Sequence, residues 1–335
     1  MKPIKTAVII MIVILAFVPA SYALNAVATL TAIFGDVKLQ RVKDGVRSNE
    51  PGQKGMILED KDLVITGPNA RTTLLFRDGS EIRLFQNTEF MIEKTIELKG
   101  VKKRGFFNSF QLNMGSFWGK FTKNRQKTTI KTPTATCGIK GTSVSFSERN
   151  GQLNVSLSTG AIELENEDEK ILLKAGKMIE GITRTGSFNK KVKDLPYFIE
   201  IKPDNNKIII PTKGNTSKIN ITIQMMNVKT KQNVERSGRV YLSLETVVLD
   251  TDRQKTDKIV FPENITLNDR GFARFTAQIL PFNEGDYGRG KIEILAIVEG
   301  EDFMNVGAGQ TMLSYDIPQK LQKTVNIKAN TGEVN

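Results

Sequence analysis

The sequence predicts an all-β protein with two domains: an irregular, solenoid-like β-roll followed by a β-sandwich. Short runs of alternating apolar and polar residues are bounded by Gly, Asn, Asp and Pro, which is typical of strands joined by tight turns. A chain of 335 residues is longer than one typical small domain. Its 39% hydrophobic and 25% charged residues form an ordinary globular composition, which disfavours extended disorder.

Residues 1–23 are predicted to be a secretory signal. Lys2 and Lys5 precede the apolar run Thr6–Val18, and a small-x-small pattern ends at Ala23. This order of a basic region, an apolar core and a small residue predicts cleavage after Ala23. The alternative is an uncleaved anchor, because apolar residues resume at Leu24–Leu30. Polar residues and Pro interrupt the combined run, whereas a membrane span needs roughly 20 apolar residues. We therefore expect an exported chain, periplasmic or associated with the cell envelope.

The sequence indicates no catalytic centre, metal site or cofactor. It contains no His and one Cys, Cys137. Catalytic triads built on His and zinc sites built on His or several Cys are therefore excluded. Hydrolysis by two carboxylates is the remaining enzymatic alternative, but no such pair stands on a recognisable scaffold. Cys137 lies among apolar residues, as a buried strand thiol does. We expect a protein that is not an enzyme.

Residues 24–183 are rich in Gly and are predicted to form very short strands. An Asp-Gly pair after Phe76 signals a hairpin, with Asp78–Ser80 as the expected loop. That loop places Phe76 opposite Ile82. It also places Leu74 opposite Leu84, so that apolar side chains share one face.

A second hairpin is expected at Thr159-Gly160. Its turn places Leu157 opposite Ile162 and, one step further, Val155 opposite Leu164. Such short strands bury little apolar area singly and must stack. No strict repeat is visible, so an irregular roll is favoured over a regular β-helix.

Several pieces of this first region occur in a characteristic order. They are Gly35-Asp36-Val37, Thr66-Gly67, "LLFRDGSEIRLFQNTEF", "IKTPTATCGIKGTSVSF", "VSLSTGAIEL" and "ILLKAGKMIEG". Together they resemble the FecR domain, named for periplasmic regulators of ferric-citrate uptake, over about residues 30–182. Gly141 and Pro133 suit a sharp turn and a strand start, so the shared pieces are interpreted as a fold signature. The resemblance implies an envelope protein whose FecR-like domain contacts partners.

The family's regulators also carry a cytoplasmic anti-sigma segment before a membrane span. Here only Met1–Lys5 precedes the apolar run, so we expect no direct contact with a sigma factor.

Residues 184–196 are polar and basic and are predicted to be a linker, and residues 318–335 a polar tail. Between them, residues 197–317 are predicted to form an immunoglobulin-like (Ig-like) β-sandwich, because a series of short strands suits that architecture. The expected strands are Lys207–Ile210, Ile219–Val228, Val240–Leu249, Ile265–Leu267, Phe272–Leu280, Lys291–Ile297 and Thr311–Tyr315. The piece "NDRGFARFTAQI" resembles a strand of bacterial immunoglobulin-like domains.

The most unusual local feature is Leu98–Ser147, which contains basic and aromatic residues and no acidic residue. Cations and rings together suit an interfacial patch facing anionic groups. The alternative is that the rings are core and the cations only solvate loops. The candidate binding residues are the cations of two expected loops: Lys102, Lys103, Arg104, Lys123, Arg125 and Lys127.

The acidic run Glu163–Glu169 contains oxygen ligands that calcium prefers, but it lacks the spacing of a calcium-binding loop. It is interpreted as a solvated turn.

The sequence therefore predicts an exported, non-enzymatic envelope protein whose FecR-like domain is a binding or scaffolding module for a protein or polymer. The alternative is a periplasmic regulator that senses an envelope state and signals through a separate membrane protein. A net charge of +12 favours an acidic envelope protein, an anionic envelope polymer or a membrane surface as partner. Nucleic acid is not an expected partner of an exported chain.

Overall fold

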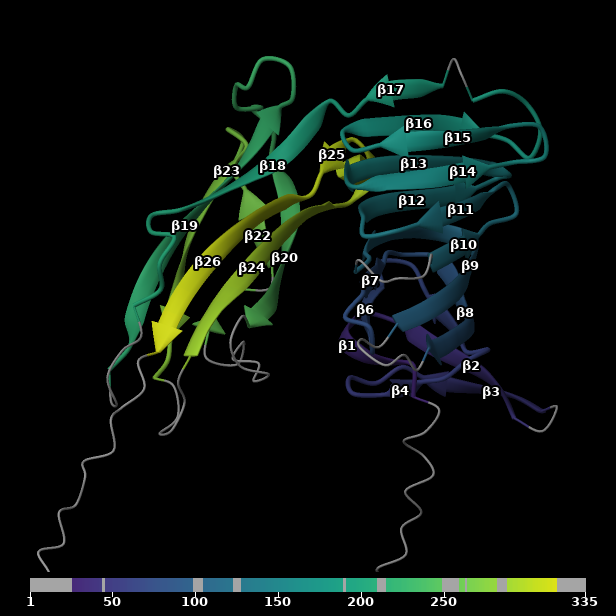
Figure 1. Cartoon of the computed structure of the whole chain (residues 1–335), viewed down its shortest axis with the longest axis horizontal. Coiled ribbons are helices and arrows are strands. Elements are labelled where there is room, and N and C mark those ends of the chain that lie inside the picture. The colour runs from purple at the N-terminus through teal and green to yellow at the C-terminus, as the bar shows by residue number, and fades with distance from the viewer. Residues whose placement is uncertain are drawn as a thin grey trace, which may run out of the picture. The chain divides into compact units, whose positions relative to one another are not determined.

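The chain folds into two compact β units, with the boundary between Leu195 and Pro196. In the computed structural model the described residues are 26–43, 46–98, 105–122, 128–188, 191–209, 215–248, 259–262, 264–281 and 288–317 (Figure 1). The predicted signal and polar tail lie outside these residues. Within them, strands and turns dominate, and the 3-10 helix η3 (Glu301–Met304) is short. The predicted all-β class is confirmed.

In the first unit the strands stack as rungs of a roll with two facing sheets (Figure 1). Sheet A contains, in spatial order, β4 (Ile57–Leu58), β1 (Ala28–Phe34), β6 (Arg71–Phe76), β7 (Glu81–Leu84), part of β9 (Gly105–Lys120), β12 (Ser143–Arg149), β13 (Gln152–Thr159), β16 (Lys177–Ile182) and β17 (Val192–Asp194). Neighbouring strands of sheet A are antiparallel.

Sheet B contains, in spatial order, β3 (Val46–Pro51), β2 (Val37–Lys43), β5 (Leu63–Thr66), β8 (Thr88–Leu98), the other part of β9, β10 (Thr128–Lys131), β11 (Thr136–Ile139), β14 (Ala161–Glu165) and β15 (Lys170–Lys174). Its neighbouring strands are antiparallel except for β9 and β10, which run parallel.

Strand β9 joins the two sheets. Its first part pairs with β8 and β10 in sheet B, and its last residues pair with β7 and β12 in sheet A. The crossing occurs at Gly115, whose φ is +95°. A Cβ there would lie 2.4 Å from the Asn87 carbonyl oxygen and 2.4 Å from the Thr88 Cα, so only Gly fits this passage.

The core of the first unit lies between the sheets. Side chains from sheet A, such as Phe146, meet side chains from sheet B in one buried cluster. Aromatic contacts cross the same space. The ring centroids of Phe76 and Phe110 are 4.8 Å apart, and those of Phe90 and Phe117 are 5.5 Å apart. Stacking thus buries apolar area that no single short strand could bury.

The β6–β7 hairpin has the expected loop length but a different register. Leu74 lies opposite Ile82. The Phe76 amide donates to the Ser80 carbonyl at 2.9 Å, so the loop is 77–79. The predicted pairings of Phe76 with Ile82 and of Leu74 with Leu84 are both wrong. In a loop of this length the left-handed residue comes last, and Gly79, with a φ of +83°, takes that place.

The predicted hairpin at Thr159-Gly160 is also wrong. Strand β13 belongs to sheet A and β14 to sheet B, so Gly160 turns the chain from one sheet to the other. Leu157 and Ile162 both enter the core, but from opposite sheets. A sequence pattern of buried faces does not distinguish a hairpin from such a corner, because both place alternate side chains inward.

Much of the predicted linker belongs to the first unit. Val192–Asp194 form strand β17 on the edge of sheet A, where Val192 pairs with Ile179. Phe188 is 1% exposed and packs in the core, and Leu195 is also buried. The polar composition hid these two apolar anchors, whose burial fixes the segment.

The second unit is a β-sandwich of two sheets around a separate core. One sheet contains, in spatial order, β21 (Ile259–Val260), β23 (Phe272–Ile279), β19 (Ser217–Asn227), β18 (Tyr197–Pro203) and β25 (Val306–Gly307). The other contains β22 (Asn264–Leu267), β20 (Gly238–Val248), β24 (Gly288–Glu299) and β26 (Gly309–Ile317).

Most strands of the sandwich were predicted, and the immunoglobulin-like assignment stays a prediction. In the described part of the expected strand at 207–210, Lys207 makes only an isolated bridge to Ser314. Strands β18, β21 and β25 were missed, and the last two contain only two residues each. No helix in the described ranges has the length and apolar character that crossing a bilayer requires.

Candidate functional site

The six candidate binding residues, Lys102, Lys103, Arg104, Lys123, Arg125 and Lys127, lie outside the described residues. Their segments, 99–104 and 123–127, are flanked by residues that the structure does describe. The first segment connects β8 to β9, and the second leads from Thr122 into β10. The flanking residues therefore show where the two segments are rooted.

Described residues near both segments contact Asp78, in the turn between β6 and β7. The Asp78 carboxylate accepts a hydrogen bond from Asn108 Nδ2, near the start of β9, at 2.8 Å. The Asp78 carbonyl accepts one from Thr122 Oγ1 at 3.1 Å. The Thr122 amide also donates to Ser80 Oγ at 3.2 Å. We call Asp78, Ser80, Asn108 and Thr122 the Asp78 corner.

Further contacts hold the same side of the roll together. Arg77 Nη2 lies 3.7 Å from Glu97 Oε2, next to the end of β8. The backbones of Phe121 and Thr142 exchange hydrogen bonds of 2.8 and 3.1 Å. Lys140, from the same acid-free stretch, is exposed just before Thr142. The described ends of both basic segments thus reach one side of the roll, and an exposed cation lies on that side.

The Asp78 corner could not be singled out from the sequence. Asp78 was interpreted only as a turn residue, and Asn108 and Thr122 are of types common in strands and loops. What joins them is the passage of β9 from one sheet to the other, after which Asn108 and Thr122 both contact Asp78. No local pattern encodes that return.

Most aromatic residues of the acid-free stretch are core residues, whereas Phe107 is only half-buried. Phe110, Phe117 and Phe121 belong to the buried cluster of the first unit, and Phe106 is 8% exposed. Their rings are therefore engaged inside the roll. The structure supports the interpretation of these rings as core.

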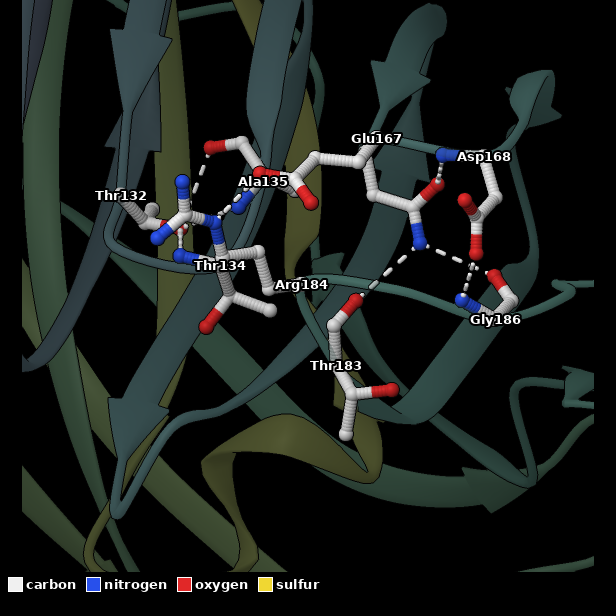
Figure 2. A network of polar contacts seen from close by, with 9 residues as sticks. Thr132, Thr134, Ala135, Glu167, Asp168, Thr183, Arg184 and Gly186 are labelled. Atoms are coloured by element: carbon white, nitrogen blue, oxygen red, sulfur yellow. Dashed lines mark hydrogen bonds and ion pairs between the residues drawn. The ribbon is translucent and has the colours of Figure 1, made fainter.

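The acidic run forms a turn that binds the chain's own backbone. The Asn166 side chain donates to the carbonyls of Thr183 at 3.1 Å and Gly186 at 2.9 Å (Figure 2). Asp168 Oδ2 accepts from the Gly186 amide at 2.6 Å, and Glu169 Oε2 accepts from the Phe188 amide at 2.6 Å. We call Asn166–Glu169 the acidic clamp, because it holds the segment that leads to β17.

The clamp's charges are also partly neutralised. Arg184 Nε donates to Glu167 Oε1 at 2.5 Å, and the Glu167 amide donates to the Arg184 carbonyl at 3.1 Å (Figure 2). No group of three or more potential metal-binding side chains is found among the described residues. The geometry of the clamp is that of a structural turn.

The Thr-Pro motif is structural as well. Thr132 Oγ1 accepts hydrogen bonds from the amides of Thr134 at 3.1 Å and Ala135 at 3.0 Å (Figure 2). It also donates to the Ala135 carbonyl at 3.1 Å. These bonds close the turn between β10 and β11. These bonds engage the Thr132 hydroxyl, which a reactive role would need.

Cys137 is fully buried in the core. Burial raises the pKa of its thiol well above the usual range, and the nearby Glu148 carboxylate raises it further. A thiol that does not ionise is a poor nucleophile and metal ligand. The interpretation of Cys137 as a small hydrophobic strand residue fits this environment.

Two solved structures show limited likeness to the chain. One is a protein from Parabacteroides distasonis, provisionally described as an anti-sigma factor, with 13% identity and a TM-score of 0.33. That match covers 39% of this chain and 59% of the other, so the chain spans little more than half of its length. The other is alpha-2-macroglobulin from Escherichia coli, with 12% identity, a TM-score of 0.19 and coverage of 88% and 30%. Both TM-scores are too low to indicate a shared overall fold.

No curated protein matches the chain. A family model described as "FecR protein" matches residues 62–163. The matched residues run from β5 to β14 and include the Asp78 corner, the Gly115 crossing and the Thr-Pro turn. Residues 62–163, within the first unit, therefore match the FecR family.

Proposed function

We propose that the chain is a non-enzymatic protein of the cell envelope, and that its FecR domain binds an envelope protein or an anionic envelope polymer. The proposed contact surface is formed by Lys102, Lys103, Arg104, Lys123, Arg125 and Lys127. The second unit would serve as a platform, in keeping with its predicted immunoglobulin-like character.

The observation that supports this proposal is the Asp78 corner. Two segments that are 19 residues apart between Arg104 and Lys123 are rooted on one side of the roll, through Asn108 and Thr122. Cations gathered on one side attract an anionic partner more strongly than cations spread over a surface. Because most rings of the stretch are buried, electrostatic contact is expected to be the main contribution, so binding should weaken with salt.

The alternative function is regulation. A FecR domain favours a regulatory, signalling-related role and not an enzymatic one. In that case the basic surface would contact a separate membrane protein that carries the signal onward. An unchanged transcript profile after deletion of the gene would count against this alternative.

The proposal is tested by affinity capture after cross-linking in intact cells. The natural protein is compared with a variant in which the six proposed residues are replaced by Gln. A matched control replaces six exposed cations elsewhere: Arg47, Lys54, Lys218, Lys229, Arg270 and Arg274. Circular dichroism establishes that each variant is folded.

We expect a specific envelope partner with the natural protein and the control, and its loss with the first variant. A partner retained by all three proteins would place the contact elsewhere. Equal loss of the partner in both variants would show that binding depends on net charge and not on these six residues. Capture of no partner by the natural protein would contradict a binding role.

A further inference from the structure

Strand β15 is an open edge of sheet B. It pairs with β14 on one side, and no ladder in the described residues joins its other side to another strand. Three other strands of the first unit, β3, β4 and β17, also pair on one side only. β4 has two residues, β17 has three, and β3 ends in Pro51. Such short or Pro-containing edges are poor templates for another strand.

The hydrogen-bond pattern shows which residues of β15 face the open side. The Asn166 amide donates to the Glu169 carbonyl at 3.1 Å, and the Ala175 amide donates to the Gly160 carbonyl at 3.0 Å. Bonded and non-bonded pairs alternate along an antiparallel ladder. Because the bonded pairs at both ends of the ladder fix this alternation, Ile171 and Leu173 are the residues of β15 whose backbone groups bond to β14. Lys170, Leu172 and Lys174 therefore direct their amides and carbonyls away from it.

The side chains of the same three residues lie on the outer face. Leu173 is 1% exposed and Ile171 packs against the core, so these two point inward. Leu172 is 58% exposed. Lys170 Nζ lies 3.3 Å from Glu163 Oε2 and 3.7 Å from Glu165 Oε2 on β14, whereas no ion pair joins Lys174 to another described residue. The open edge thus combines free backbone groups with the outer pattern Lys-x-Leu-x-Lys.

This pattern disfavours a second copy of the chain as the occupant. Two-fold pairing of β15 with itself, centred on Leu172, places Lys170 of one copy opposite Lys174 of the other at both ends. Like charges directly opposite each other destabilise a strand pair. A strand with acidic residues opposite Lys170 and Lys174 and an apolar residue between them would replace each repulsion by an attraction.

We propose that β15 binds an extended polypeptide segment of a partner protein by strand addition, and that the segment carries an apolar residue with an acidic residue two places to each side. Because Lys170 and Lys174 flank Leu172 symmetrically, such a segment fits in either direction. The backbone provides affinity, and the outer side chains select the sequence. This interface is separate from the proposed basic surface.

The test uses the purified full chain and a short labelled peptide of alternating Thr with a central Leu and a Glu two places to each side. A control peptide carries Lys in place of each Glu. Fluorescence anisotropy measures binding. Hydrogen exchange is followed by NMR at the amides of Lys170, Leu172 and Lys174. We expect these amides to exchange quickly in the free protein and slowly with the Glu peptide, and the Lys peptide to bind at least about tenfold more weakly.

Two variants separate backbone from charge. Leu172→Pro removes an amide that faces the open side, without removing a bond to β14, and should abolish binding. Leu172→Thr keeps that amide and should bind about fivefold more weakly. Lys174→Glu should weaken the binding of the Glu peptide about tenfold. A peptide in which one Glu is changed to Lys should bind this variant with the affinity that was lost.

Equal binding of the Glu and Lys peptides, or no binding of the Glu peptide, would overturn the proposal. So would unchanged binding by Leu172→Pro. If Leu172→Pro does not fold, the Lys174→Glu exchange decides. The variant that lacks the six basic residues should bind the Glu peptide normally. The two interfaces can therefore fail independently.

Discussion

At the scale of single residues, Gly115 determines whether the roll can form. It is the point where β9 leaves sheet B for sheet A, and the backbones of Asn87 and Thr88 lie against it. A side chain at this position has no space, and the φ of +95° is itself unfavourable for any residue with a Cβ.

We expect Gly115→Ala to lower the free energy of unfolding by roughly 3 kcal/mol or more, since steric overlap adds to backbone strain. Gly55 is the matched control, because its φ is +87° and a Cβ there would meet nothing within 4 Å. Gly55→Ala should cost only about 1 kcal/mol. Urea unfolding of the two variants measures the difference. Equal losses would show that Gly115 is not held as described.

At the same scale, Glu93 makes the stability of the folded state depend on pH. It lies at a bulge in β8, where Lys131 Nζ is 2.8 Å from Oε2 and Ser109 Oγ donates to Oε2 at 2.5 Å. Burial raises the pKa of Glu93, but the hydrogen bonds from Lys131 and Ser109 outweigh burial and leave the pKa below its ordinary value. The folded state thus favours the ionised form.

A lowered folded-state pKa stabilises the fold above the unfolded pKa of about 4.3 and loses that contribution as the pH falls through the folded value. We expect Lys131→Met to cost roughly 0.5–1 kcal/mol at neutral pH and little near pH ~3. Lys38→Met, which removes the exposed pair with Asp36, is the control and should cost little at either pH. Urea titrations at both pH values test this, and a cost for Lys131→Met that does not fall with pH would contradict it.

At the scale of elements, the acidic clamp fixes the last rung of the roll. Its hydrogen bonds hold residues 183–188, after which β17 pairs with β16. A solvated turn was the prediction for this run, and the turn is present. Its bonding to residues 183–188 was not predicted, because those residues have the composition of a polar linker.

We expect Asn166→Ala to increase hydrogen exchange in residues 183–188 and β17, because two carbonyls lose their donor. Asn227→Ala is the control. Asn227 Oδ1 accepts from the amides of Lys229 and Thr230 in a turn of the second unit. It should affect that turn alone. Exchange measured by mass spectrometry that stays unchanged in residues 183–188 would refute the clamp.

At the scale of elements, some features could be predicted from the sequence and others could not. The strands, their inward faces and the FecR signature could be predicted, because alternation and turn residues are local. The register at Gly79 and the corner at Gly160 could not, since a buried face has the same pattern in a hairpin and in a passage between sheets. The Asp78 corner depends on such a passage, so the sequence predicted basic segments without showing that residues near both of them contact Asp78.

At the scale of the whole molecule, two separate cores predict two separate unfolding events. Phe146 lies in the core of the first unit and Ile221 in that of the second, and both are 0% exposed. Multi-domain chains commonly depart from two-state unfolding.

In its own unit, Phe146→Ala should cost about 3–5 kcal/mol and Ile221→Ala about 2–5 kcal/mol. In calorimetry each variant should lower the temperature of one transition and leave the other in place. A single transition that shifts equally in both variants would show that the units unfold as one.

The side of the roll at the Asp78 corner is proposed to carry the partner contact, and site-specific photo-cross-linking tests this most directly. A photoreactive residue is placed at Lys103 or Arg125, and, for comparison, at the exposed Asn69 or Asn150. After irradiation of intact cells, we predict one shared cross-linked envelope partner from Lys103 and Arg125 and none from Asn69 and Asn150. The same partner captured from Asn69 or Asn150, with none from Lys103 and Arg125, would contradict the proposed contact.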